Sequence, residues 1–143
     1  MVLDVLNFAG IAVFAASGAM LGVRKDFDMW GIITVGVLTG VGGGVLRDVL
    51  LGITPPASIS GWGPIVTATV AGLVVFFFHP AFTALHRSIL VLDAFGMGLF
   101  AATGASIALD VGASPFAATT VGLLTAVGGG VLRDMISNEI PLL

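Results

Sequence analysis

Five long apolar stretches dominate the chain, separated by short segments that hold most of the polar residues. They cover residues 5–23, 29–51, 63–78, 89–109 and 115–136. Most of them reach the roughly 20 residues that a helix needs to cross a bilayer core, and the third could extend back to residue 59. Because backbone groups in lipid must be satisfied within their own segment, the pattern predicts an all-α polytopic membrane protein.

The connections between the stretches carry residues that end helices or suit a membrane interface. These are the charged segment 24–28, the prolines at 55–56, His79-Pro80, and the turn at 110–115. Trp30 and Trp62 fall at predicted span ends, where an amphipathic ring is stable. These residues between the apolar stretches therefore support five separate helices.

Composition agrees with a lipid environment and excludes several classes. The 143 residues are 57% hydrophobic and 9% charged, against roughly 25% charged in soluble domains. A net charge of −3 with five basic residues gives no nucleic-acid surface, and without Cys there is no thiolate site. The first stretch follows Asp4 rather than a basic segment, so we interpret it as a retained helix rather than a signal peptide.

One eight-residue segment occurs twice, letter for letter. Val-Gly-Gly-Gly-Val-Leu-Arg-Asp covers residues 41–48 and again 127–134, an offset of 86 residues (127 minus 41). The same offset aligns Phe14 with Phe100 and Pro55 with Pro141 without a gap. Eight consecutive matches in one register indicate an internal repeat, with residues 1–88 as the first copy and residues 89–143 as the second.

The repeat period contains three spans, so the second copy must enter the membrane from the opposite side. This predicts inverted three-helix repeats, whose functional site lies near the midplane where interrupted helices meet. It also places Arg47 and Arg133 toward opposite faces. The second copy stops after two helices, so we expect at least one further helix, either lost by truncation of a longer protein or replaced by a partner.

The triple glycines are the first candidate site. Glycine costs about 1 kcal/mol in a helix interior, so three in a row favour a kink or a short unwound turn, with a water-filled path beside the freed carbonyls. Close helix packing is the alternative, and it is at least as good an explanation for Gly36, Gly40 and Gly43 on one face. The candidate pore and kink residues are Gly42, Gly43, Gly44, Gly128, Gly129 and Gly130.

The Arg-Asp pairs that follow the glycines are the second candidate site. Ionisable groups inside a span usually mark a pathway or a paired contact. Arg47 with Asp48, and Arg133 with Asp134, could form structural pairs, shape or gate the path, or snorkel to the interface. A bare arginine would repel a permeating cation, so each pair is expected to act as one unit.

Smaller polar residues complete the candidates. Repeat-equivalent Asn7 and Asp93 lie near predicted helix starts, where capping is favoured, with lining of the pore mouth as the alternative for Asp93. Hydroxyls deep in the spans could bond to their own helix or line the path. They are the equivalent pairs Ser17 with Thr103 and Thr39 with Thr125.

Catalytic and metal chemistry find no support in the pattern. His79 and His86 lie in a connection without a third ligand nearby, and the glycine run lacks the Lys-Ser/Thr of a phosphate loop. We therefore expect neither an enzyme nor a cofactor.

The doubled Gly-Gly-Gly-x-x-Arg-Asp, on the second helix of each inverted copy, resembles the prokaryotic branch of the trimeric intracellular cation (TRIC) channel family. That branch overlaps bacterial proteins that carry a glycine-transporter name. The resemblance implies seven transmembrane helices, a symmetric trimer, and an ion path within each protomer between glycine-kinked second and fifth helices. This chain departs from it by lacking the sixth and seventh helices.

Two functions remain. The resemblance favours a channel for monovalent cations, most plausibly potassium, whereas inverted repeats are also typical of secondary transporters, here for a small solute such as glycine. We expect lipid and sister copies as partners, in a prokaryotic inner membrane. Arg24, Lys25 and Arg87 share one side, so the positive-inside rule places the N-terminus outside.

Overall fold

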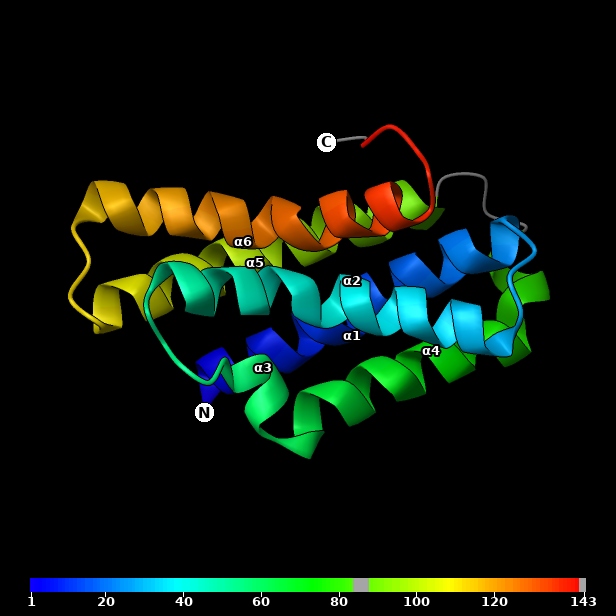
Figure 1. Ribbon diagram of the computed structural model, residues 1–143, viewed down its shortest axis with the longest axis horizontal. Helices are drawn as coiled ribbons and strands as arrows, with labels where there is room; N and C mark the ends of the chain where they lie inside the picture. The colour runs from blue at the N-terminus through cyan, green and yellow to red at the C-terminus, as the bar shows by residue number, and fades with distance from the viewer. Residues whose placement is uncertain (84–87, 142–143) are drawn as a thin grey trace.

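A computed structural model describes residues 1–83 and 88–141 of the chain, and all regular structure in these residues is helical (Figure 1). Five helices are long and apolar enough to cross a membrane, which confirms the predicted polytopic helical fold. The helices are α1 (Val2–Arg24), α2 (Met29–Leu50), α3 (Ala57–Ser60), α4 (Trp62–Thr83), α5 (Ser88–Asp110) and α6 (Pro115–Ile136).

The third predicted span agrees with the membrane-crossing part of α4, Trp62–His79, but its suggested extension back to residue 59 does not form. Residues 57–60 form the separate short helix α3, and α4 begins at Trp62. α4 then runs through Pro80 to Thr83, although the His79-Pro80 pair predicted an end. Pro80 has no N–H to give to the carbonyl of Phe76 four residues earlier. The Nδ1 atom of His79 lies 2.8 Å from that oxygen instead, so the turn is retained.

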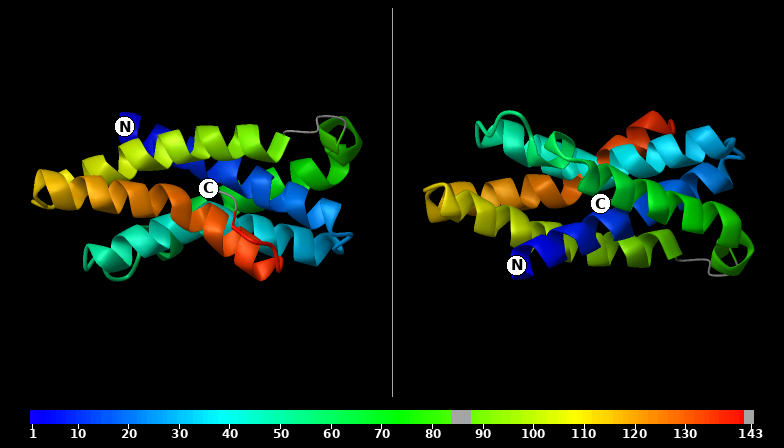
Figure 2. Two further views of the ribbon diagram at one scale, coloured as in Figure 1. Left: turned by 90° about the horizontal axis from the view of Figure 1, so that it is seen from above. Right: turned by 90° about the horizontal axis from the view of Figure 1, so that it is seen from below.

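Helices α2 and α6 lie side by side and run in opposite directions, with α6 along the upper edge of the bundle in Figure 1. α1 packs along α2 on one side, and α5 packs along α6 on the other. α4 covers the outer face of α1 and α2. The α1–α2 connection, the last turn of α4 and the first turn of α5 lie toward one end of the molecule, while the N-terminus, α3 and the α5–α6 turn lie toward the other (Figure 2).

Backbone geometry repeats at the same offset as the sequence. Asp26 and Gly112 both have positive φ angles, 54° and 87°, just after α1 and α5. Gly52 and Asn138 do the same after α2 and α6, with φ angles of 70° and 54°. Each left-handed residue lets the chain turn back and satisfy a free carbonyl at the helix end. The two copies therefore end their equivalent helices in the same way.

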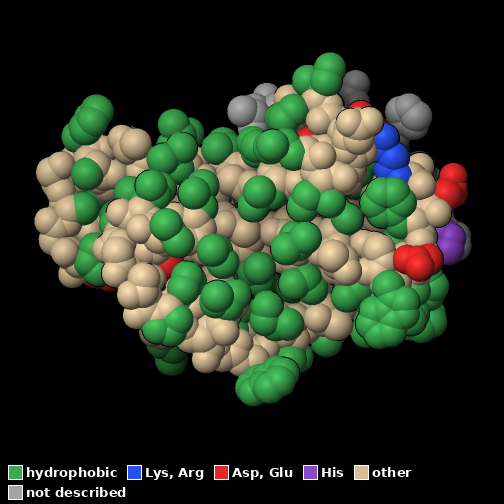
Figure 3. Space-filling view, viewed as in Figure 1, with side chains coloured by type: hydrophobic (Ala, Val, Ile, Leu, Met, Phe, Trp, Pro, Cys, Tyr) green, Lys and Arg blue, Asp and Glu red, His purple; other side chains and the backbone are tan. Residues whose placement is uncertain are grey.

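The outer surface of the molecule is largely apolar, and charged side chains are buried inside it beside an apolar core. Large apolar side chains such as Trp62, Phe77 and Phe116 are exposed, and they spread over the length of the bundle (Figure 3). The charged side chains of Arg47 and Arg133, in contrast, are each only 2% exposed. This inversion of the usual soluble pattern is what a bilayer around the helices requires.

Candidate functional site

The centre of the molecule is a reciprocal contact between the two repeats. A Cβ atom placed on Gly43 of α2 would collide with the backbone carbonyl oxygen of Thr125 on α6. A Cβ atom placed on Gly129 of α6 would collide with the carbonyl oxygen of Thr39 on α2. Since only glycine lacks that atom, the middle glycine of each triplet is what lets the two helices cross at backbone contact.

Two phenylalanines stack beside this crossing. The rings of Phe14 on α1 and Phe100 on α5 lie with centroids 5.1 Å apart and planes tilted by 46°. Each ring also covers a glycine of the opposite helix, Phe100 against Gly10 and Phe14 against Gly96. Both side chains are 1% exposed, so the pseudo-two-fold axis passes through a closely packed apolar core.

The glycine triplets themselves remain α-helical. α2 continues without interruption from Met29 to Leu50, and α6 from Pro115 to Ile136, so the short unwound turn that we considered does not form. Both helices nevertheless change direction part way along, as Figure 2 shows. In α2 every glycine faces a neighbour, with Leu132 against Gly42 and Ser58 against Gly44. Close packing, the alternative explanation, accounts for these contacts.

The threonine hydroxyls are committed to their own helices. Thr39 donates to the carbonyl of Val35 at 2.6 Å, and Thr125 donates to the carbonyl of Val121 at 2.6 Å. Thr103 donates to the carbonyl of Leu99 at 2.9 Å. All three threonines are completely buried. These three bonds match the first alternative from the sequence, whereas the Ser17 hydroxyl bonds to Asp93 on α5; pore lining stays a prediction.

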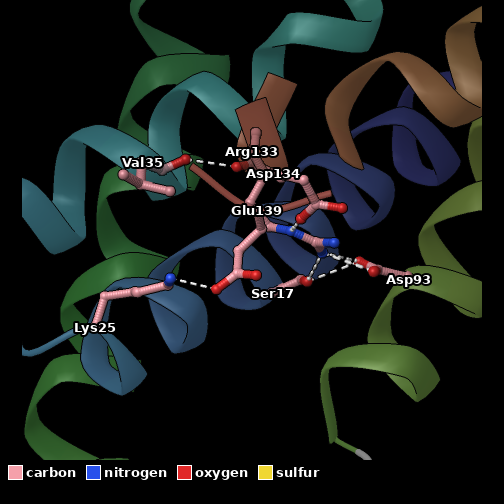
Figure 4. Close-up of polar contacts among 8 residues, drawn as sticks. Ser17, Lys25, Val35, Asp93, Arg133, Asp134 and Glu139 are labelled. Atoms are coloured by element: carbon pink, nitrogen blue, oxygen red, sulfur yellow. Dashed lines mark hydrogen bonds and ion pairs between the residues drawn. The ribbon is translucent and has the colours of Figure 1, made fainter. Parts of the chain in front are cut away.

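Arg133 is the hub of a buried polar network, which we call the Arg133 cluster: Ser17, Asp93, Arg133 and Asp134. The Nε of Arg133 donates to Asp134 at 2.7 Å, and its Nη1 lies 2.6 Å from both carboxylate oxygens of Asp93. Nη1 also donates to the Ser17 hydroxyl at 2.6 Å, and that hydroxyl donates to Asp93 at 2.7 Å. Figure 4 shows these groups converging from α1, α5 and α6.

Arg47 forms a smaller cluster at the opposite end, which we call the Arg47 cluster: Arg47 and Asp48 with the backbone amide of Ala57. The Nε of Arg47 donates to Asp48 at 2.7 Å, the same arrangement as in the other repeat. The second carboxylate oxygen of Asp48 accepts the amide of Ala57 at 2.8 Å and so holds the start of α3. The Nη1 atom of Arg47 is buried without a hydrogen-bond partner among the described residues.

These contacts decide several of the sequence alternatives. Each arginine is paired with the aspartate that follows it, and neither arginine snorkels, because both are packed inside the bundle. A role of the pairs in shaping or gating a path stays a prediction. The capping interpretation of Asp93 and Asn7 is wrong. α5 already begins at Ser88 and α1 at Val2, so both residues lie within helices. Asp93 instead forms an ion pair with a residue forty positions later in the chain.

One polar contact had no counterpart in the sequence analysis. Lys25, after α1, forms an ion pair with Glu139, after α6, and both side chains are partly exposed (Figure 4). The pair ties the two repeats together at the end that holds the Arg133 cluster. The sequence could have predicted this pair, because it places opposite charges just beyond two helix ends on the same side of the membrane. Arg87 and His86 lie outside the described residues.

In the part of the chain that the structure describes, no group of three or more His, Asp or Glu side chains is placed to hold a metal ion. The interior ion pairs join each arginine to the aspartate that follows it, and Arg133 also to Asp93 on another helix. The site is therefore a set of charged clusters on either side of a glycine crossing, and ionisable groups inside a span usually mark a pathway or a paired contact.

Five spans, two inverted copies and buried charges toward both ends define the class as a polytopic helical membrane protein built on an inverted repeat. A family profile described as "Glycine transporter" matches residues 4–80 and 90–143, so the chain belongs to that family. Among its relatives, a UPF0126 membrane protein of Deinococcus radiodurans is 41% identical over 95% of this chain and 63% of its own length. The UPF0126 inner membrane protein YadS of Escherichia coli K12 is 35% identical over 96% of this chain and 67% of its own.

Solved structures give the same fold at high similarity. A TRIC trimeric intracellular cation channel orthologue from Rhodobacter sphaeroides matches with a TM-score of 0.96 and 38% identity, over 99% of this chain and 73% of that one. A second TRIC cation channel, from work on conductance, matches with a TM-score of 0.86 and 43% identity, over 99% of this chain and 70% of that one. The resemblance to the TRIC family is confirmed, and this chain spans 63% of the D. radiodurans relative.

Proposed function

We propose that the chain forms the core of a membrane channel for monovalent cations, with potassium as the principal ion. The observation that carries the proposal is the match to TRIC cation channels at TM-scores of 0.86 to 0.96 with 35% to 43% identity. The full protein is proposed to assemble as a trimer, as the TRIC name states for the Rhodobacter sphaeroides relative. The ion path is proposed to run within each protomer, between α2 and α6.

The arrangement of charge supports a cation path. Each buried arginine has an adjacent aspartate at 2.7 Å, which offsets the repulsion that a bare guanidinium would exert on a cation. The Arg133 cluster holds one more carboxylate than guanidinium, and this excess favours cations near that end. When the α2–α6 crossing opens, the backbone carbonyls of Thr39 and Thr125, which pack against the opposite glycines, are proposed to supply further oxygen ligands of the kind that replace an ion's hydration shell.

The structure fits a closed conformation of this path. Gly43 and Gly129 are in backbone contact with the opposite helix, and the Phe14–Phe100 pair fills the space beside them. Opening requires α2 and α6 to separate at the crossing, and the Arg-Asp clusters toward either end are proposed to shape or gate the passage. The glycines allow this movement because they have no side chains to disengage.

Single-channel recording from the purified full-length protein in planar bilayers tests the proposal. We expect unitary current steps in potassium chloride whose reversal potential follows the potassium gradient. Gly43→Leu combined with Gly129→Leu should abolish these steps, because the added side chains cannot pass the opposite carbonyls. Gly98→Leu is the matched control, since Gly98 is exposed on α5 with no neighbouring atom near its Cβ position. Current that survives the double substitution would exclude the crossing as the path.

A secondary transporter for a small solute such as glycine is the second candidate. The family description "Glycine transporter" and the inverted repeat both favour it, because alternating access usually moves one inverted half against the other. Saturable glycine uptake into proteoliposomes, without unitary currents, would establish this function and overturn the channel.

Location and organisation follow as further proposals. We propose an inner-membrane site, as named for the E. coli relative, with the N-terminus outside and lipid around the bundle. Cysteine labelling at Asn138 and at Val111, which lie at opposite ends, measures this orientation with a membrane-impermeant maleimide. The division into residues 1–88 and 89–143 is proposed as the two halves that move.

A further inference from the structure

The two arginines make the same first contact but differ in the second. In both repeats Nε donates to the following aspartate at 2.7 Å, so the guanidinium groups are held in equivalent positions. The Nη1 of Arg133 then has an acceptor from each of two other helices, Asp93 and Ser17. The Nη1 of Arg47 is buried and has no acceptor among the described residues.

The repeat explains the difference. The position equivalent to Asp93 is Asn7 on α1, and the position equivalent to Ser17 is Thr103 on α5. Thr103 uses its hydroxyl within its own helix, donating to Leu99. Asn7 carries a neutral amide where the other copy has a carboxylate. By the repeat alignment, the Arg47 cluster therefore corresponds to the Arg133 cluster with one anionic acceptor replaced by a neutral one.

A buried N–H of a charged group that lacks an acceptor is costly, because the group has lost its water. In the Arg133 cluster the acceptor is a carboxylate, and both of its oxygens lie 2.6 Å from the one atom Nη1. The chemistry that satisfies the Nη1 of Arg47 is therefore a singly charged oxyanion brought from outside. We propose that the Arg47 cluster is a binding site for such an oxyanion, which takes the place that the Asp93 carboxylate has in the other repeat.

The ligand could be the carboxylate of a small solute or the phosphodiester of a lipid headgroup, because both present the same pair of oxygens. Binding would give the two ends the same excess of one negative charge. The inference goes beyond cation conduction, since it concerns an anion, and binding can be measured whether or not the protein conducts.

Formate is the probe, as the smallest carboxylate, titrated into the purified full-length protein in a chloride buffer of constant ionic strength that contains no other oxyanion. We expect saturable stabilisation against thermal unfolding. Asn7→Asp should weaken formate binding by about tenfold or more, because the new carboxylate supplies the acceptor internally, as Asp93 does. The matched control is Asn138→Asp, the same chemical change on an exposed residue at the other end, which should leave binding unchanged.

A second measurement keeps the test decisive if Asn7→Asp fails to fold. Arginine side-chain NMR of the wild-type protein should show formate shifting the Arg47 signals and leaving those of Arg133 in place. Displacement of formate by glycine would identify a soluble carboxylate as the source, and displacement by phosphatidylglycerol a lipid; either result supports the site. Absence of saturable binding, a shift at another arginine, or full binding in a folded Asn7→Asp variant would overturn it.

Discussion

The Arg133 cluster and the Arg47 cluster contain arginines of the same eight-residue motif, yet these arginines make different contacts. Arg133 contacts three side chains on three helices, whereas Arg47, among the residues that the structure describes, contacts its neighbouring aspartate alone. Asp48 accepts a hydrogen bond from the backbone amide at the start of α3. The Arg47 cluster therefore contacts the segment that follows its own helix, whereas the Arg133 cluster contacts distant helices. Two copies of one motif thus differ because the residues around them differ, at Asn7 and Asp93 above all.

Among substitutions in the two clusters, Asp93→Ala is expected to lower the free energy of unfolding most. The substitution removes the partner of a buried guanidinium, and loss of one member of a buried pair costs about 3 kcal/mol or more. Asn7→Ala, at the equivalent position, should cost less than about 1 kcal/mol, because no ion pair is lost there. Reversible unfolding in mixed micelles measures both free energies. Equal losses would mean that the two clusters are energetically alike.

Ser17→Ala should give the next largest effect. The Ser17 hydroxyl accepts from Arg133 and donates to Asp93, so its removal leaves two charged groups short of a contact, at about 2 kcal/mol. Thr103→Val is the matched control in the other repeat, where the hydroxyl bonds only within its helix, and should cost about 0.5 kcal/mol. The same unfolding measurement applies, and a larger effect at Thr103 would contradict the assignment.

Gly44→Ala and Gly130→Ala compare equivalent glycines in different surroundings. A methyl group at Gly44 must displace the Ser58 hydroxyl of α3, whereas no described atom lies within 4 Å of the same point at Gly130. Alanine is favoured over glycine in a helix by about 1 kcal/mol, so Gly130→Ala should stabilise by up to that amount and Gly44→Ala should not. Thermal midpoints in one detergent test this order, and the reverse order would refute it.

The smallest effect is expected for the Lys25–Glu139 pair, which supports the Arg133 end only. Both side chains are partly exposed, at 33% and 45%, so screening limits the coupling to about 0.5 kcal/mol. A double-mutant cycle with Lys25→Ala and Glu139→Ala gives this coupling directly, and it should fall as salt is raised. Coupling that is unaffected by salt would point to a more buried contact.

The sequence predicted the helices and the repeat because both leave local, periodic signals. Apolar length marks the spans, and the offset of 86 residues marks the copies. It could not show that Asp93 pairs with Arg133, because that contact depends on how α5 and α6 pack rather than on either segment alone. Asp93 lies close to the predicted start of its helix, which made capping the favoured interpretation. In the structure α5 already begins at Ser88, and Asp93 forms an ion pair with the buried Arg133 instead.

The glycine triplets show a second limit of prediction. Three glycines in succession weaken a helix by propensity, which predicted a local break. In the structure the same glycines are selected by their neighbours, since a carbonyl, a serine and a leucine each occupy the space that a Cβ would need on α2. Tertiary contact with the opposite repeat determines the role of these residues, and no single segment contains that information.

The reciprocal crossing also bears on how such a duplicated chain can change over time. Gly43 depends on a carbonyl of the second copy, and Gly129 depends on a carbonyl of the first. A substitution that widens one helix here harms the fit of both copies at once, so the two halves are expected to diverge most freely where they do not touch. Asn7 and Asp93 occupy equivalent positions away from the crossing, and at these positions the two copies carry different residues with different contacts.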